Sequence, residues 1–229
     1  MSNSPKPPEY YAKKAPYLGW GEEGQKLDKQ RLQLLEKYIV GKKILDIGCG
    51  LGFYTDYLSK QGHDSWGVDF VTDFINQAKK SRQGNFVLGK AEQLPFEDNS
   101  FDTVILFDIL EHGDDKVFLS EAKRVSRKRV LLIVPRQVDS VLEKSGVIFR
   151  HYLDKSHLRE YQEEDLYSLS KQVNLKLKYL EPVHSLYNET IFLVLFKGPL
   201  LLKKFIRKIV FLFLPKEDYS TEYFAVLEK

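Results

Sequence analysis

Cysteine is nearly absent from the sequence. Cys49 is the single cysteine among 229 residues, which excludes an intramolecular disulfide and a zinc site built from several cysteines. The chain therefore does not depend on the disulfides that stabilise many small secreted folds, and a reducing compartment suits it best. We expect a cytoplasmic protein.

Long uncharged apolar runs and a strong charge excess are also missing. No apolar stretch reaches the roughly 18 uncharged residues of a membrane-spanning helix, and the N-terminal MSNSPKPPEYYAKK lacks the apolar core of a signal peptide. We expect a chain that is neither secreted by that route nor membrane-spanning. The 35 Lys and Arg residues against 32 Asp and Glu leave a net charge of +3. That is too little for a dedicated nucleic-acid-binding domain, so no nucleic-acid partner is expected.

What the sequence does contain is an alternation of short apolar runs with amphipathic segments. With 43% hydrophobic residues the chain can bury a core, and no linker divides it, so we predict one domain over 1–229. The apolar runs predict strands at 43–47, 65–70, 85–89, 103–107, 129–135, 175–183 and 221–229. The segments between and around them predict helices within 23–39, 53–62, 72–82, 115–126 and 163–173. The first two dozen residues, rich in Pro, Gly, Tyr and Lys, predict an irregular lead-in.

This alternation is typical of an α/β fold. Strand, helix and strand in regular succession predict a doubly wound, Rossmann-like, mostly parallel sheet with helices on both faces. Ligands of such sheets bind at the carboxyl ends of the strands. We therefore expect functional residues directly after the strands.

Three glycines follow the first strand of this sheet. Gly48, Gly50 and Gly52 occupy alternate positions before a helix, where glycine allows positive φ and a close approach of a ligand to the backbone. A tight turn that packs a helix on a sheet needs glycine too, so the loop alone is a weak signal. Asp69 closes the next strand, about 20 residues further on, where a carboxylate meets ribose hydroxyls in nucleoside-binding βαβ units.

The loop departs from the dinucleotide fingerprint G-x-G-x-x-G, because its third glycine comes one residue early. The pattern D-x-G-C-G-x-G instead resembles the class I S-adenosylmethionine-dependent methyltransferases. The stretch GKAEQLPFEDNSFD at 89–102 is similar to the segment after that family's third strand, and FDILEH at 107–112 is similar to the segment after its fourth strand. The resemblance covers residues 43 to 135. It implies S-adenosylmethionine as cofactor and a seven-stranded sheet whose last strand is antiparallel.

The resemblance also implies roles for single residues. Asp69 would accept hydrogen bonds from both ribose hydroxyls, Phe70 would pack on the adenine, and Asp108 would border the transferred methyl group. Lys90 stands where the family commonly has Asp, so a side-chain contact to the adenine amino group is not expected there. Cys49 fits this loop better as a small packing residue than as a ligand-binding one, and Asp102 fits better as the residue that fixes the start of a strand. The positions assigned to the cofactor are Asp46, Gly48, Cys49, Gly50, Gly52, Asp69, Phe70, Ala91, Glu92 and Asp108.

Methyl transfer from a sulfonium is an in-line displacement that needs positioning and no metal. A hydroxyl or ammonium acceptor also needs a base, and histidine is the usual one near pH 7. The candidates for catalytic groups are His112, His151, His157 and Tyr161. Alternatively, the alternating His157, Arg159 and Tyr161 hold a loop against the domain, His112 borders a helix, and the reaction uses no base.

An insertion of unusual composition separates the last two predicted strands. We place it at 184–221, and within it residues 191–214 are strongly apolar yet carry five cations and no acid. From Pro199 onward the spacing predicts a basic amphipathic helix over 199–214, which either lies in a membrane interface or packs on the fold or on a second subunit of a homodimer. The membrane alternative would suit a lipid-like acceptor rather than another small molecule. The N-terminal 1–40, with Tyr10, Tyr11, Tyr17 and Trp20, would then form a lid over the cofactor.

Two further functional hypotheses remain open at this stage. A nicotinamide-dependent Rossmann oxidoreductase shares the logic of strand, glycine loop and acid. A non-catalytic member of the fold would keep the cofactor site and use the insertion for binding.

Overall fold

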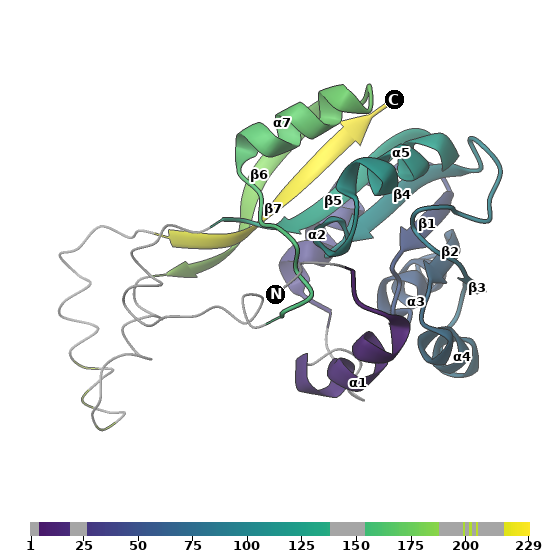
Figure 1. Ribbon diagram of the computed structural model, residues 1–229, viewed down its shortest axis with the longest axis horizontal. Coiled ribbons are helices and arrows are strands. Elements are labelled where there is room, and N and C mark those ends of the chain that lie inside the picture. The colour runs from purple at the N-terminus through teal and green to yellow at the C-terminus, as the bar shows by residue number, and fades with distance from the viewer. Residues whose placement is uncertain are drawn as a thin grey trace.

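A single mixed β-sheet flanked by helices forms the body of the protein (Figure 1). The computed structural model describes residues 5–18, 27–137, 154–187 and 218–229, together with 199, 202 and 205. The strands are β1 (Lys43–Ile47), β2 (Asp64–Asp69), β3 (Asn85–Leu88), β4 (Phe101–Phe107), β5 (Ser126–Pro135), β6 (Lys176–Tyr187) and β7 (Asp218–Glu228). The helices are α1 (Pro8–Leu18), α2 (Lys29–Tyr38), α3 (Phe53–Lys60), α4 (Thr72–Ser81), the 3₁₀ helix η1 (Leu110–His112), α5 (Asp115–Val125) and α7 (Glu163–Gln172).

The strand order is β3-β2-β1-β4-β5-β7-β6. Strands β1 to β5 pair in parallel, whereas β7 runs antiparallel to both β5 and β6. Ile47 at the end of β1 pairs with Val68 of β2 on one side and with Leu106 of β4 on the other. The carboxyl ends of β2, β1 and β4 therefore lie next to one another. The predicted fold class, including the antiparallel last strand, is confirmed.

The sheet is buried on both faces because the chain covers each face with helices. Helices α5 and α7 pack on one face, where Leu45, Ile47 and their neighbours in β4 and β5 form the larger core cluster. Helices α2 and α3 pack on the other face, where Ile44 and Ile105 belong to a second cluster. Every residue of β4 is buried, which explains why its sequence reads as a continuous apolar run rather than an alternating one.

The N-terminal segment differs from the prediction. Residues Pro8–Leu18 form the helix α1 and not an irregular lead-in. Tyr11 is buried against Val71 and Phe74 at the start of α4, so tertiary packing stabilises a helix that the local composition does not favour. Proline at the first helical position is compatible with this, because its missing N–H has no partner there in any helix.

The strands around the insertion also extend further than predicted. Strand β6 continues to Tyr187 and β7 begins at Asp218, so the ends of the predicted 184–221 segment belong to the sheet. The predicted helix over 199–214 falls almost entirely outside the described residues. Two of its apolar side chains are described, and both are exposed, Leu202 at 47% and Phe205 at 63%. Within the described ranges, no helix is long and apolar enough to span a membrane.

Candidate functional site

The glycine loop after β1 adopts the backbone that the sequence predicts. Gly48, Gly50 and Gly52 all have positive φ, at 71°, 52° and 77°. A Cβ on Gly48 would lie 1.9 Å from Ile109 Cδ1, and one on Gly52 would lie 2.4 Å from the Phe86 ring. A Cβ on Gly50 would meet no protein atom within 4 Å. The middle glycine therefore borders open space, whereas the outer two are required by close packing.

Asp69 closes β2 beside this loop, and only 7% of it is exposed. Its Oδ2 accepts a hydrogen bond from the Gly50 N–H at 2.9 Å, and its Oδ1 accepts one from the Val71 N–H at 2.8 Å. Burial raises the pKa of Asp69, although these backbone donors oppose the shift. A carboxylate offers about four acceptor positions, so the backbone bonds do not exhaust them.

Asp46 and Cys49 lie deeper in the same region. The Asp46 carboxylate accepts a hydrogen bond from Thr55 Oγ1 at 2.9 Å, and burial raises its pKa to about 7. The Cys49 side chain packs beside Ile75 and Ala78, and a Cβ on Gly67 would lie 2.8 Å from its Sγ. Burial raises the pKa of the Cys49 thiol well above its ordinary value. This environment matches the packing interpretation of Cys49 and does not favour a thiolate.

Asp108 follows β4 directly, in a left-handed conformation with φ at 58°. Its carboxylate accepts hydrogen bonds from both terminal nitrogens of Arg31 in α2, from Nη1 at 2.6 Å and from Nη2 at 3.0 Å. The same Nη2 donates to Glu222 of β7 at 2.6 Å. Burial would raise the pKa of Asp108, but the Arg31 guanidinium outweighs it and holds the pKa below its ordinary value. Asp108 is therefore an oriented carboxylate, and its side chain remains 43% exposed.

Helix α1 covers the space between these two acids. Tyr11 contacts Phe70 in an edge-to-face arrangement with ring centroids 5.4 Å apart, and it contacts the His112 ring in the same way at 5.6 Å. Helix α1 lies close to α4 (Figure 1). An aromatic wall thus runs from the residue after Asp69 to the residues after Asp108.

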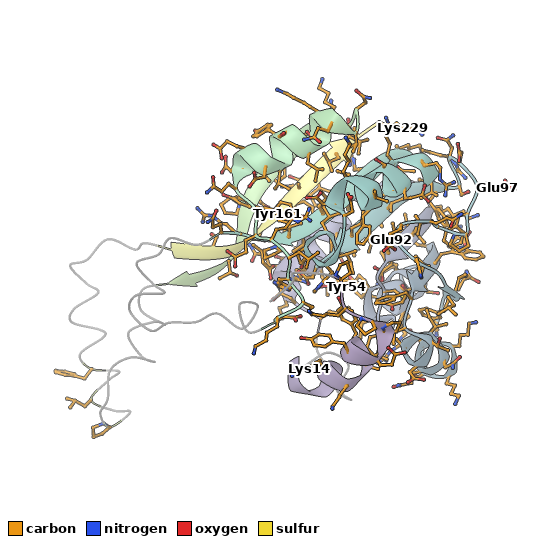
Figure 2. The ribbon with its side chains drawn as sticks, viewed as in Figure 1. Lys14, Tyr54, Glu92, Glu97, Tyr161 and Lys229 are labelled. Carbon is orange, nitrogen blue, oxygen red and sulfur yellow. The ribbon has the colours of Figure 1, made fainter. Side chains whose placement is uncertain are left out.

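The segment predicted to meet adenine follows β3. Ala91 is half-buried and Glu92 is exposed, and Figure 2 labels Glu92 in the loop between β3 and β4. The backbone of Lys90 forms a short antiparallel bridge with Gln93, which gives this stretch a tight turn. Asp102, in contrast, lies at the opposite end of the sheet and accepts from the Lys42 and Lys43 N–H groups at 2.9 and 3.1 Å. It fixes the start of β4, as expected.

Two of the predicted catalytic histidines lie together. The rings of His112, at the end of η1, and His157 are 4.9 Å apart and inclined by 70°. Burial lowers the pKa of His112, and burial together with the neighbouring His112 lowers the pKa of His157 to about 4. Both imidazoles are therefore neutral near pH 7. His151 falls outside the described residues.

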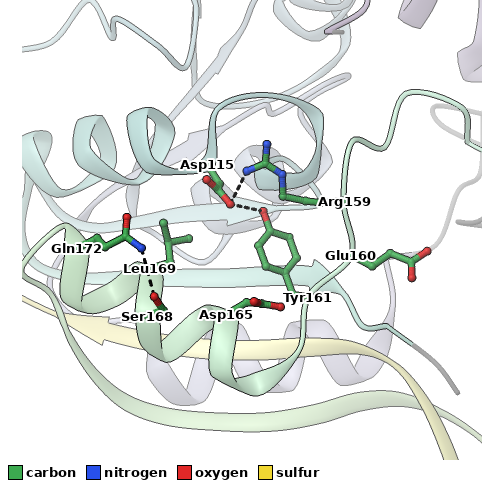
Figure 3. A pocket seen from close by; sticks show the side chains of 8 residues that line it. All are labelled: Asp115, Arg159, Glu160, Tyr161, Asp165, Ser168, Leu169 and Gln172. Atoms are coloured by element: carbon green, nitrogen blue, oxygen red, sulfur yellow. Dashed lines mark hydrogen bonds and ion pairs between the residues drawn. The ribbon is translucent and has the colours of Figure 1, made fainter. Parts of the chain in front are cut away.

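Tyr161 lies apart from this pair. It is 2% exposed, and its hydroxyl donates to Asp115 Oδ2 at 3.3 Å, where Arg159 Nη1 also binds at 2.5 Å. Figure 3 shows these three side chains at the wall of a pocket of about 280 Å³ beside α7, and Figure 2 shows Tyr161 where the chain enters that helix. Burial raises the pKa of Tyr161 far above its ordinary range. The contacts match the alternative that this segment holds a loop against the domain, and a catalytic role of Tyr161 stays a prediction.

Several site residues were not predicted from the sequence. Arg31 lies 77 residues before Asp108 and 191 residues before Glu222 in the sequence. Neither Arg31 nor Glu222 belongs to a motif. Glu111 stands inside the FDILEH segment without an assigned role, although it is only 1% exposed. An acid within an apolar stretch after a strand was the one signal that could have singled it out.

Comparison with known proteins identifies a methyltransferase domain in the chain. Residues 45–134 match the family Methyltransf_11, described as a methyltransferase domain. An uncharacterized protein of Methanocaldococcus jannaschii is 25% identical over 177 residues, which cover 77% of this chain and 82% of that protein. A demethylmenaquinone methyltransferase of Corynebacterium glutamicum is 33% identical over 139 residues, which cover 59% of this chain and 58% of the relative, little more than half of its length.

Solved structures agree on the fold. A SAM-dependent methyltransferase from Archaeoglobus fulgidus superposes with a TM-score of 0.68 at 21% identity and covers 96% of this chain and 100% of its own. The magnesium protoporphyrin IX methyltransferase of Synechocystis, solved with bound S-adenosylhomocysteine, has a TM-score of 0.60 at 15% identity and covers 96% of this chain and 97% of its own.

The residues present fit the cofactor of these enzymes. The open space at Gly50, the buried carboxylate of Asp69 and the oriented carboxylate of Asp108 lie at three neighbouring strand ends. Residues 45–134 are therefore a methyltransferase domain, and the sheet that carries it has the fold of solved S-adenosylmethionine-dependent methyltransferases.

Proposed function

We propose that the protein methylates a small, lipid-like acceptor with an aromatic hydroxyl, such as a reduced quinone. The observation that carries the proposal is the aromatic wall of Tyr11 and Phe70, which leads from the cofactor loop to Asp108 and His112 at the acceptor end. An apolar, planar acceptor suits such a wall, because ring edges and faces pack on one another. The demethylmenaquinone methyltransferases among the relatives support this acceptor class.

The cofactor would lie along the carboxyl ends of β2, β1 and β4. Asp69 would hold the ribose hydroxyls, Phe70 and the backbone of Ala91 would border the adenine, and Gly50 would allow the chain to approach the methionine part. Bound S-adenosylmethionine supplies an electrophilic methyl group on a sulfonium. Asp108, held by Arg31 in a fixed orientation, would position the methionine end.

The acceptor end would be bordered by His112 and His157. Both imidazoles are neutral, so either could take a proton from an acceptor hydroxyl as the oxygen or an adjacent ring carbon attacks the methyl group. This role stays a prediction for both histidines, as it does for His151.

Transfer can be measured directly with a short-chain demethylated naphthoquinol. The purified protein, S-adenosylmethionine and the reduced acceptor should yield a product heavier by one methylene group in mass spectrometry. Cofactor binding, measured separately by calorimetry with S-adenosylhomocysteine, controls for an intact site. Binding without turnover on any reduced quinone would contradict the acceptor class and would favour a non-catalytic role.

Peripheral membrane contact through 199–214 belongs to the same proposal. The exposed side chains of Leu202 and Phe205 and the cations of this segment suit a surface of anionic lipid. Replacement of Lys203, Lys204, Arg207 and Lys208 together by Glu should abolish flotation with anionic liposomes. Unchanged flotation would indicate that the segment packs elsewhere, and a homodimer is one such arrangement.

A further inference from the structure

Glu111, His112 and His157 form a compact group; we refer to it as the Glu–His cluster. One donor atom from each residue lies within 4.8 Å of the other two. Glu111 Oε1 is 4.0 Å from His112 Nε2 and 3.9 Å from His157 Nε2. Two of the ligands come from η1 and the third from the segment before α7, so the fold brings them together from 45 residues apart in sequence.

Among the residues that the structure describes, none donates a hydrogen bond to the carboxylate of Glu111. Neither of its oxygens has a partner among the described residues, and the residue is 1% exposed. Its backbone is held in place, because the Leu158 N–H donates to the Glu111 carbonyl oxygen at 2.8 Å. An unpaired carboxylate at such a depth costs several kcal/mol. The group must therefore carry a proton or face a cation.

Hydrogen bonds determine which nitrogen of His112 carries its proton. The Ser156 hydroxyl donates to Asp154 Oδ1 at 2.6 Å, and the Ser156 N–H donates to the same oxygen at 2.9 Å. The Ser156 hydroxyl oxygen is therefore an acceptor for His112 Nδ1–H, at 3.1 Å. The lone pair of His112 is then on Nε2, the nitrogen near Glu111.

This arrangement is the one that metal-binding histidines show. A ligating imidazole commonly donates its second N–H to a carboxylate, carbonyl or water, which fixes its tautomer and orientation. Here a series of hydrogen bonds leads from His112 through Ser156 to Asp154. The second Asp154 oxygen, Oδ2, also has no hydrogen-bond partner among the described residues and lies 3.9 Å from His157 Nε2.

We propose that the Glu–His cluster binds one divalent transition-metal ion through a carboxylate oxygen of Glu111 and the Nε2 atoms of His112 and His157. Metal–ligand bonds of about 2.0–2.2 Å require neighbouring ligand atoms roughly 3.0–3.5 Å apart, so the two carboxylate–imidazole pairs must approach by about 0.5–1 Å and the widest pair of the cluster by roughly 1.5 Å. Two imidazoles and one carboxylate suit Zn²⁺, Mn²⁺ or Fe²⁺ and leave further coordination positions open. Binding of the ion does not depend on the acceptor proposed above, but it replaces the base role proposed there for His112 and His157, because their Nε2 lone pairs would hold the metal.

Cobalt provides the probe, because its visible absorption reports nitrogen and oxygen ligands directly. Tag-free, full-length protein, stripped with a chelator, is titrated with Co²⁺ and then with Zn²⁺. We expect one equivalent of Co²⁺ to give a d–d spectrum that Zn²⁺ abolishes. Glu111→Gln and His157→Asn should each weaken binding at least tenfold. Ser156→Ala, which removes only the partner of His112, should weaken it about 10- to 100-fold.

The matched control is His63→Asn, because His63 directly precedes β2 and so lies at the amino-terminal ends of the strands, away from the cluster. This variant should bind Co²⁺ like the wild type. Retained S-adenosylhomocysteine binding identifies the variants that fold. If Glu111→Gln does not fold, the result for His157→Asn decides the test. Absence of stoichiometric Co²⁺ binding, or binding that neither Glu111→Gln nor His157→Asn weakens, would overturn the proposal. Loss of methyl transfer alone would not bear on it.

Discussion

Asp69 offers the sharpest test of the cofactor site, through the substitution Asp69→Asn. The carboxylate accepts from two backbone N–H groups and, in the proposal, from two ribose hydroxyls. An amide keeps one acceptor oxygen, so one charge-assisted bond to ribose is lost and the other is weakened. At about 1.5–3 kcal/mol for a hydrogen bond to a charged group, we expect a loss near 3 kcal/mol, or roughly 100-fold in Kd.

Isothermal calorimetry with S-adenosylhomocysteine measures this loss. The substitution also leaves one buried N–H opposite an amide NH₂, which should lower the free energy of unfolding by about 1–3 kcal/mol in urea. Asp102→Asn is the matched control, because Asp102 also accepts two backbone N–H groups but lies at the other end of the sheet. It should reduce stability by a similar amount and leave binding unchanged. An Asp69→Asn affinity within threefold of wild type, or an equal loss in the control, would refute the reasoning.

Three further predictions follow from the same geometry. Because burial raises the pKa of Asp46 from 3.8 to about 7, ionisation opposes folding: stability should fall as the pH rises from about 4 through 7, by at most about 4 kcal/mol. Asp46→Asn should remove that slope in urea titrations between about pH 4 and 8, and a parallel slope would contradict it. Gly50→Ala should cost only about 1–2 kcal/mol of stability, from the left-handed backbone, since its Cβ meets no protein atom. Its affinity for S-adenosylhomocysteine should nevertheless fall more than tenfold, and an unchanged affinity would place the ligand elsewhere. Arg31→Met removes the cation that Asp108 and Glu222 share and should lower the free energy of unfolding by about 1–3 kcal/mol, because solvent reaches part of the Asp108 carboxylate; an unchanged free energy of unfolding would contradict this.

The sequence by itself determined the elements of the core and the position of the cofactor loop. Strand and helix periods are local, and they placed β1 and the helices α3 to α5 close to their observed bounds. The alternate glycines and Asp69 were recognisable because each stands directly after a strand. In a parallel sheet, such positions converge at one edge whatever the rest of the chain does.

Only the tertiary structure decided which charges meet after β4. Arg31 reaches Asp108 and Glu222 because the order β1-β4-β5-β7 brings the final strand close to α2, and no local pattern encodes that distance. Helix α1 forms because Tyr11 packs on Phe70 and on the start of α4, although the composition of residues 8–18 does not favour a helix. Glu111 likewise gains its significance only from His157, 46 residues away. Local propensity sets secondary structure, whereas buried charge depends on contacts that exist only after the chain has folded.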